Sequence, residues 1–157
     1  MHHFLAEITL SSPEDTALFA RQLAAKLAPG DVVLLSGGIG AGKTHFARSV
    51  IQSLLLVPED VPSPTFTLVQ TYDTIKGELW HADLYRLNDP SELVELGLTD
   101  AFEDAVCLVE WPDRLGSITP QNAVHLTFKL GDEDDARHLT IQASSPRWAF
   151  LKDIATS

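Results

Sequence analysis

Eight consecutive residues have the types and spacing of a phosphate-binding loop. They match the pattern G-x-x-x-x-G-K-[ST]. An apolar run at 32–35 precedes them, and a helical pattern extends from 43 to about 55. This strand-loop-helix context favours a phosphate-binding loop over a plain glycine-rich turn before a helix. Such glycines let the chain curl so that backbone N–H groups point at phosphate oxygens. Lys43 would reach the β and γ phosphates, and Thr44 would offer its hydroxyl to Mg²⁺. The expected nucleotide-binding residues are Gly37, Gly38, Ile39, Gly40, Ala41, Gly42, Lys43 and Thr44.

Two acidic residues come at the ends of expected strands. Glu110 ends the apolar strand 105–110, and Asp83 ends the strand 78–84. Ligands of open α/β sheets bind at the carboxyl ends of the strands, so either carboxylate could hold Mg²⁺ or orient an attacking water. Each could instead be a surface carboxylate, and Asp83 could pair with Arg86. The sequence leaves the division of roles between the two acids open.

Three more residues are candidates for the same site. Thr65 lies in a proline-rich loop and could sense the γ phosphate as switch-loop hydroxyls do, or could simply belong to a turn. Trp111 follows Glu110 and could flank the nucleotide or a partner, or be a core aromatic. His81 is expected to be a hydrogen-bonded strand residue rather than a general base.

The elements that position these residues alternate between strands and helices. Ser12 and Pro13 predict a helix start, and the helix should run to about residue 27. Asp89 and Pro90 predict a second such start, closed by Gly97. Strands are expected at 4–10, 32–35, 66–72, 78–84, 105–110, 124–130 and 136–143.

This order predicts one α/β domain spanning residues 1–157. We expect a P-loop NTPase-like three-layer fold, in which helices flank a central mixed, mainly parallel sheet and the chain ends in a β-hairpin. The acidic turn at 132–135 is expected to be a solvated tip, with partner docking as the alternative. The single cysteine, Cys107, lies in an apolar run and is expected to be a core residue rather than a catalytic thiol.

Charge and hydropathy limit the classes of partner. The formal net charge is −11, with 11 Lys and Arg scattered singly against 22 Asp and Glu. Such a chain would repel a nucleic acid, so another subunit should hold any RNA that enters its biology. Because no apolar stretch approaches the roughly 18 residues of a membrane span and the N-terminus does not resemble a signal peptide, we expect a cytoplasmic protein.

The motifs narrow the class of enzyme without fixing it. There is no Asn-Lys-x-Asp motif, which disfavours a GTPase. Kinases of small molecules use several arginines to clamp phosphates, and only Arg86 and Arg114 lie close in sequence to the candidate site. A small-molecule kinase and a nucleotide-dependent adaptor that needs no turnover remain alternatives to an ATPase.

Four sequence blocks follow one another along the chain: Gly37 to Thr44 followed by Phe46, Ser63 to Val69, His81 to Leu87, and Val109 to Pro112. In order and spacing, these blocks resemble the TsaE family of P-loop ATPases. The resemblance covers about three quarters of the chain.

The resemblance implies an ATPase that acts with the proteins TsaB and TsaD in making threonylcarbamoyladenosine beside the anticodon of tRNA. TsaD would perform the transfer to tRNA, and ATP hydrolysis would reset or drive the complex. By position, Lys43 and Thr44 would bind phosphate and Mg²⁺. Asp83 and Glu110 would be the catalytic or metal-binding acids, and Thr65 the switch hydroxyl.

The chain departs from this family at two positions in the loop region. Gly38 stands where many members have Asp, and His45 where many have a second Thr. Backbone N–H groups bind the phosphates, so we expect ordinary nucleotide affinity with altered turnover. By the same resemblance, Trp111 would lie at the edge of the active site.

Overall fold

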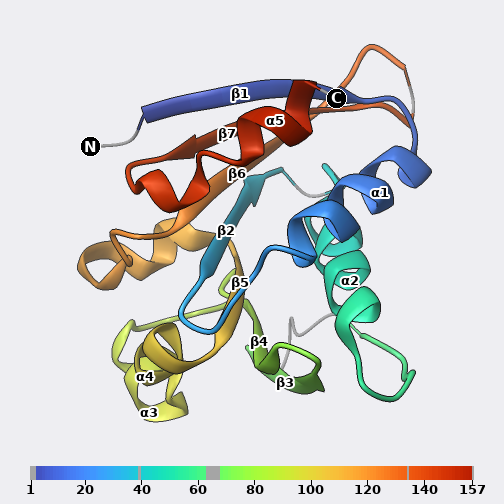
Figure 1. Ribbon diagram of the computed structural model, residues 1–157. Coiled ribbons are helices and arrows are strands. Elements are labelled where there is room, and N and C mark those ends of the chain that lie inside the picture. Colours follow the sequence, from blue (N-terminus) through green and yellow to red (C-terminus); the bar gives the residue numbers. More distant parts are fainter. Residues whose placement is uncertain (1–2, 39, 63–67, 134, 157) are drawn as a thin grey trace.

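The protein folds around one seven-stranded sheet, shown in Figure 1. This computed structural model describes residues 3–38, 40–62, 68–133 and 135–156. The strand order is β1-β7-β6-β2-β5-β4-β3. The three pairs from β6 to β4 are parallel and the three outer pairs are antiparallel, which confirms a mixed sheet with its parallel pairs in the centre. The strands are β1 His3–Leu10, β2 Val32–Gly37, β3 Val69–Thr74, β4 Gly77–Asp83, β5 Val106–Glu110, β6 Val124–Leu130 and β7 Arg137–Ala143.

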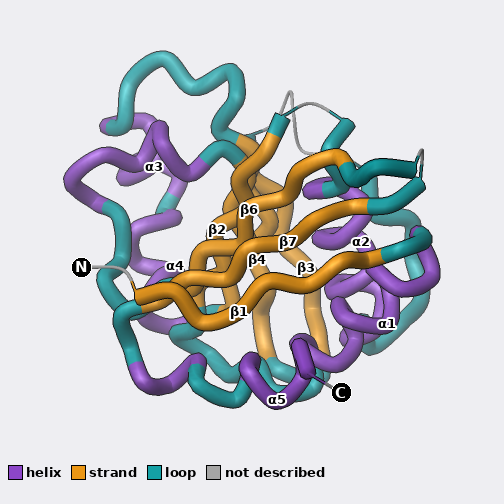
Figure 2. The backbone as a smooth tube through the Cα atoms, turned by 90° about the horizontal axis from the view of Figure 1, so that it is seen from above, coloured by secondary structure: helices purple, strands orange, loops and turns teal. Residues whose placement is uncertain are grey.

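Helices cover both faces of the sheet and give the expected three layers (Figure 2). Side chains of β2 alternate between two cores, with Val33 and Leu35 in one and Val32 and Leu34 in the other. The first core lies under α1, α2 and α5, and the second under α3, α4 and η1. The helices are α1 Pro13–Ala24, α2 Lys43–Leu54, α3 Ser91–Leu96, α4 Leu98–Asp104 and α5 Leu151–Thr156, with 3-10 segments η1 Pro112–Ile118 and η2 Pro146–Trp148.

The start of α1 follows the predicted capping, but its end comes earlier than predicted. The Ser12 hydroxyl accepts a hydrogen bond from the Asp15 amide at 3.1 Å. The helix stops at Ala24 instead of near residue 27, because the chain tightens into 3-10 bonds, with the Leu27 amide donating to the Ala24 carbonyl at 3.1 Å.

The second predicted helix is in fact two short helices that meet at Gly97. This glycine, with φ 89°, ends α3 and also precedes the first residue of α4. The sequence interpretation missed α4, whose buried residues Leu98, Ala101 and Phe102 recur at helical spacing. It also missed α5, η1 and η2, each of which is too short to show a clear period.

The third and fourth strands are shifted from their predicted ranges. β3 runs to Thr74 and meets β4 at a turn where Gly77 has φ 89°.

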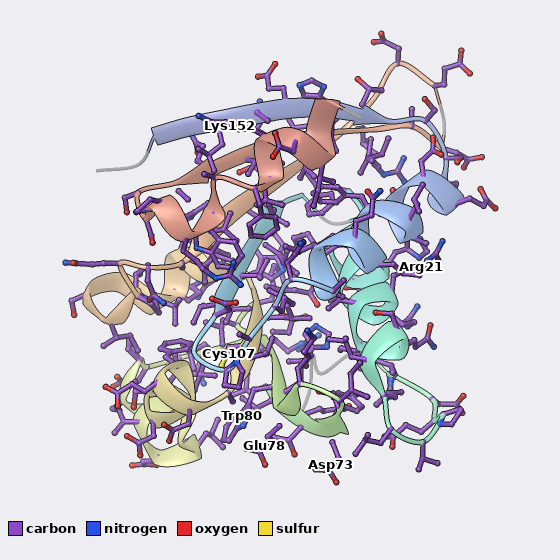
Figure 3. The ribbon with its side chains drawn as sticks, viewed as in Figure 1. Arg21, Asp73, Glu78, Trp80, Cys107 and Lys152 are labelled. Atoms are coloured by element: carbon purple, nitrogen blue, oxygen red, sulfur yellow. The ribbon has the colours of Figure 1, made fainter. Side chains whose placement is uncertain are left out.

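Cys107 is fully buried in the second core, as predicted (Figure 3). Across the described ranges, no helix is long and apolar enough to cross a membrane.

Candidate nucleotide site

The glycine loop lies between the end of β2 and the start of α2, against β6. Gly37 has φ 139°, and a Cβ built on it would lie 2.4 Å from the Phe128 carbonyl oxygen of β6, so this position requires glycine. Gly42 precedes α2 with φ 111°, a left-handed conformation that also favours glycine. Gly38 has no atom within 4 Å of its built Cβ, so a Cβ would meet no obstacle at this position. Ile39 lies outside the described residues.

Lys43 is buried against this loop. Its Nζ donates hydrogen bonds to the carbonyl oxygens of Gly37 at 2.6 Å and Gly38 at 3.0 Å. The same atom lies 4.2 Å from the centre of the Trp111 ring. Burial lowers the pKa of Lys43 from its ordinary value of 10.5, while the charge of the neighbouring Glu110 partly offsets that shift. The loop therefore concentrates a desolvated positive charge where phosphate oxygens would bind.

Glu110 connects the loop to the edge of the sheet. Its side chain is almost fully buried, and Oε1 accepts a hydrogen bond from the Thr44 hydroxyl at 2.8 Å. Its Oε2 lies 2.7 Å from Nε2 of His81. Since a carboxylate only accepts, Nε2 carries the hydrogen of this bond. A threonine of α2 and a histidine of β4 thus fix both oxygens of one buried carboxylate.

Asp83 lies directly beside Glu110, because the parallel register of β4 and β5 pairs the two residues. Its side chain is only slightly exposed, and Oδ1 accepts a hydrogen bond from the Tyr85 amide at 3.0 Å. Two acids and the loop lysine are therefore within one small region at the carboxyl edge of the sheet, the region expected from the sequence.

A pocket of about 470 Å³ opens in front of these groups. Its lining includes residues that the sequence interpretation did not assign to the site, among them Tyr85 and Arg137. The Tyr85 ring packs on Trp111, with 4.9 Å between the ring centres. The pocket is lined by Gly40, Gly42, Lys43, Thr44, His45, Asp83, Tyr85, Arg86, Glu110, Trp111 and Arg137.

Arg137 reaches the loop from the far end of the chain. It is the first residue of β7, and its Nη2 donates to the Gly40 carbonyl at 3.3 Å across 97 positions. The local sequence does not mark this contact, because it follows from the parallel pairing of β6 with β2, which turns the hairpin back beside the loop. Of the two arginines that lie close to the candidate site in sequence, Arg86 lines the pocket. Arg114 does not line it and donates to the Leu87 carbonyl instead.

Thr65 falls in the range 63–67, outside the described residues, so its predicted role stays a prediction. Most of the remaining candidates gather around one pocket, although Gly37, Gly38, Ala41 and His81 are not part of its lining. Lys43, Thr44, Asp83, Glu110 and Trp111 all contribute to its lining.

The oxygen donors present suit Mg²⁺ shared with a nucleotide. In the described part of the chain, no group of three or more His, Cys, Asp or Glu could hold a metal by itself. Mg²⁺ in phosphate-transfer sites usually takes one or two protein carboxylates, waters and substrate phosphates. The Thr44 hydroxyl bonded to the Glu110 carboxylate, with Asp83 beside it, fits that donor set.

The sheet order and the glycine loop between β2 and α2 define a fold of the P-loop NTPase-like class. Residues 10–139 match the sequence model of the family described as threonylcarbamoyl adenosine biosynthesis protein TsaE. The chain belongs to the TsaE family.

Individual relatives support the same assignment. The tRNA threonylcarbamoyladenosine biosynthesis protein TsaE of Rickettsia bellii is 40% identical over 82% of this chain and 90% of its own length. The protein of that name from Bacillus subtilis is 38% identical over 89% of this chain and 87% of its own. A crystal structure of Bacillus subtilis YdiB superposes with a TM-score of 0.78 at 30% identity, covering 99% of this chain and 96% of that one.

Proposed function

We propose that this protein binds and hydrolyses Mg²⁺-ATP as a component of the machinery that makes threonylcarbamoyladenosine in tRNA, together with TsaB and TsaD. The observation that carries the proposal is the 2.8 Å hydrogen bond between Thr44 of the loop and Glu110 at the end of β5. P-loop hydrolases hold Mg²⁺ with the loop Ser or Thr hydroxyl and an acidic residue, so a bond between such groups supports the proposal. The names of the Rickettsia bellii and Bacillus subtilis relatives support the tRNA-modification pathway.

In the proposed reaction, the loop N–H groups and Lys43 stabilise the charge that develops on the γ-phosphoryl group. Thr44 and Glu110 would hold Mg²⁺, which neutralises charge on the β and γ phosphate oxygens when bound. Asp83 is the second acid, beside this pair in the sheet, and would accept a hydrogen bond from the attacking water. The water oxygen bonds to the γ phosphorus as the bond to the β–γ bridging oxygen breaks, which yields ADP and phosphate.

In this proposal Glu110 holds the metal and Asp83 orients the water, and the hydrogen bonds of the two acids support that division. Glu110 is the acid bonded to the Thr44 hydroxyl, whereas the Asp83 carboxylate accepts from the Tyr85 amide at the pocket wall. Glu110→Asn should therefore raise the Mg²⁺ concentration needed for half-maximal nucleotide binding. Asp83→Asn should lower turnover with little change in that concentration.

Dependence on partners is part of the proposal. Arg137 lines the pocket but donates to the Gly40 carbonyl, so we expect slow turnover by the isolated protein and faster turnover when partners complete the site. By thermodynamic linkage, partners that tighten ATP binding must be bound more tightly in the presence of ATP by the same factor. With a net charge of −11, the chain should meet tRNA only through the complex.

The test is ATP hydrolysis by the purified protein alone and with TsaB and TsaD. Lys43→Ala is the inactive variant, and Lys76→Ala is the matched control, because Lys76 is a surface lysine whose Nζ donates to the Ala25 carbonyl away from the pocket. We expect a slow basal rate, a higher rate with partners, and loss of both only in Lys43→Ala. Partner-stimulated hydrolysis that survives in Lys43→Ala would refute the assigned site.

Two other outcomes would redirect the proposal. Phosphate transfer to a small acceptor instead of water would favour a kinase. ATP binding without turnover, with Glu110→Gln still supporting tRNA modification, would favour a nucleotide-dependent adaptor.

A further inference from the structure

A second, smaller pocket adjoins the candidate nucleotide site. It measures about 160 Å³ and shares Gly42, His45 and Arg137 with the larger pocket. Neither acid of the site contributes to its lining, nor does Lys43. It therefore extends the cleft on the side of the loop away from the acids. Its lining residues are Pro13, Thr16, Gly42, His45, Asp135 and Arg137.

The polarity of a bound nucleotide decides what this pocket would receive. The loop lysine and the carboxylates mark the β and γ phosphates, so those phosphates belong in the larger pocket. The α phosphate and the nucleoside must then continue past the start of α2, on the side away from Glu110 and Asp83. The smaller pocket lies beside His45, in the first turn of α2, and so occupies that position.

We propose that this smaller pocket is the base subsite, and that Asp135 and Arg137 of the C-terminal hairpin recognise the base. The inference rests on the proposed ATP binding and names the residues that would read the nucleoside. It also gives Asp135 of the acidic turn a role other than the solvated tip or the docking of a partner.

The lining supplies both the faces and the edges that a base needs. Pro13 and the His45 ring form a wall, tethered by a 3.1 Å contact between His45 Nε2 and the Pro13 carbonyl oxygen. Arg137 brings a planar guanidinium that can stack on a base or donate to its ring nitrogens. Asp135 brings a carboxylate that can accept from an exocyclic amine. An acceptor beside a donor complements the amine and neighbouring ring nitrogen of adenine.

Arg137 is held so that it can serve the loop and the subsite together. Its Nη1 donates to the Ala136 carbonyl at 2.8 Å, and its Nη2 donates to the Gly40 carbonyl at 3.3 Å. Its side chain also packs over Gly42, where a built Cβ would lie 3.6 Å from Arg137 Cγ. The Arg137 side chain would thus contact both the phosphate loop and the bound base.

The test compares a ligand that has a base with one that lacks it. Calorimetry on the full chain would give the dissociation constants of ATP and inorganic tripolyphosphate, each with Mg²⁺, for three hairpin variants. Asp135→Asn should weaken ATP by about threefold to tenfold, the value of one hydrogen bond, and change tripolyphosphate by less than about twofold. Arg137→Gln should weaken ATP more than tripolyphosphate, because only part of its loss concerns the loop.

The matched control is Asp132→Asn, which removes the same charge from the same turn outside the pocket. It should leave both constants unchanged, so that a general charge effect is separated from base recognition. Equal changes for ATP and tripolyphosphate in Asp135→Asn and Arg137→Gln, or no change in either, would overturn the subsite while leaving the phosphate site intact. A wild-type protein that binds neither ligand would contradict the proposed function itself.

Discussion

The buried contact between His81 and Glu110 provides a quantitative test of how the site is held. The two side chains are 1% and 2% exposed, and His81 supplies the donor for Glu110 Oε2. His81→Leu removes that donor and leaves a carboxylate oxygen buried without it. An unsatisfied buried acceptor costs about 1–3 kcal/mol, and more when the group is charged. Because Thr44 still bonds the other oxygen of Glu110, we expect a loss of about 3 kcal/mol, at the upper end of that range.

Urea unfolding measures this loss of unfolding free energy. In thermal unfolding, a loss of about 3 kcal/mol should lower the Tm of a chain of this size by about 6–12 °C. His81→Gln keeps a donor and should recover part of the loss. The decisive comparison is His81→Leu in a Glu110→Leu background, where no carboxylate needs a partner. There the cost should fall by about 1–3 kcal/mol, since the two residues are in contact. An equal cost in both backgrounds would show that His81 only fills space, and would refute its role in positioning Glu110.

Three further substitutions or treatments test the surrounding structure. Gly37→Ala should abolish nucleotide binding in calorimetry and destabilise the fold by several kcal/mol in urea unfolding, because the new Cβ would lie 2.4 Å from a carbonyl oxygen of β6. Gly38→Ala should change neither measurement, because no atom lies within 4 Å of a Cβ built there. Burial raises the pKa of Cys107 to about 12, so a thiol reagent at pH 8 should modify this cysteine only after unfolding. Stability should fall as pH rises above about 9, because the unfolded chain then loses the thiol proton that the folded protein keeps. Rapid labelling of the folded protein would contradict this burial. Arg147→Gln should cost about 1 kcal/mol by removing the 2.7 Å contact with Asp31, reduced because Arg147 is 37% exposed, and an unchanged urea midpoint would show that the contact adds nothing.

The phosphate end of the site could be predicted from sequence because its chemistry depends on local order. Backbone curvature, a helix start and the lysine that follows must be contiguous, so the spacing from Gly37 to Thr44 carries the motif. Glu110 was placed by a short apolar strand with an acid at its end, a pattern that the parallel sheet turns into an edge position. The contact with His81 could not be predicted, since it depends on the register between β4 and β5.

The helices after β4 show the opposite limit. Gly97 has the same conformation whether it ends one helix or separates two, so its presence alone predicted only the end of α3. The burial of Leu98 and Phe102 extends over a helix of 7 residues, too few for a period to be distinguished from a loop with apolar anchors. Tertiary packing against the second core decides this segment, and the sequence interpretation had no independent information about that core.

The other end of the proposed nucleotide cleft depends on the path of the chain. β6 runs parallel to β2, so it must end beside the phosphate loop, and β7 must begin there. Arg137 is the first residue of β7, which makes its contact with the Gly40 carbonyl a consequence of sheet order. If base recognition depends on this hairpin, then its side chains can change base preference without altering the loop that binds phosphate. The same separation would explain why the motif with Lys43 identifies the family while leaving the base unspecified.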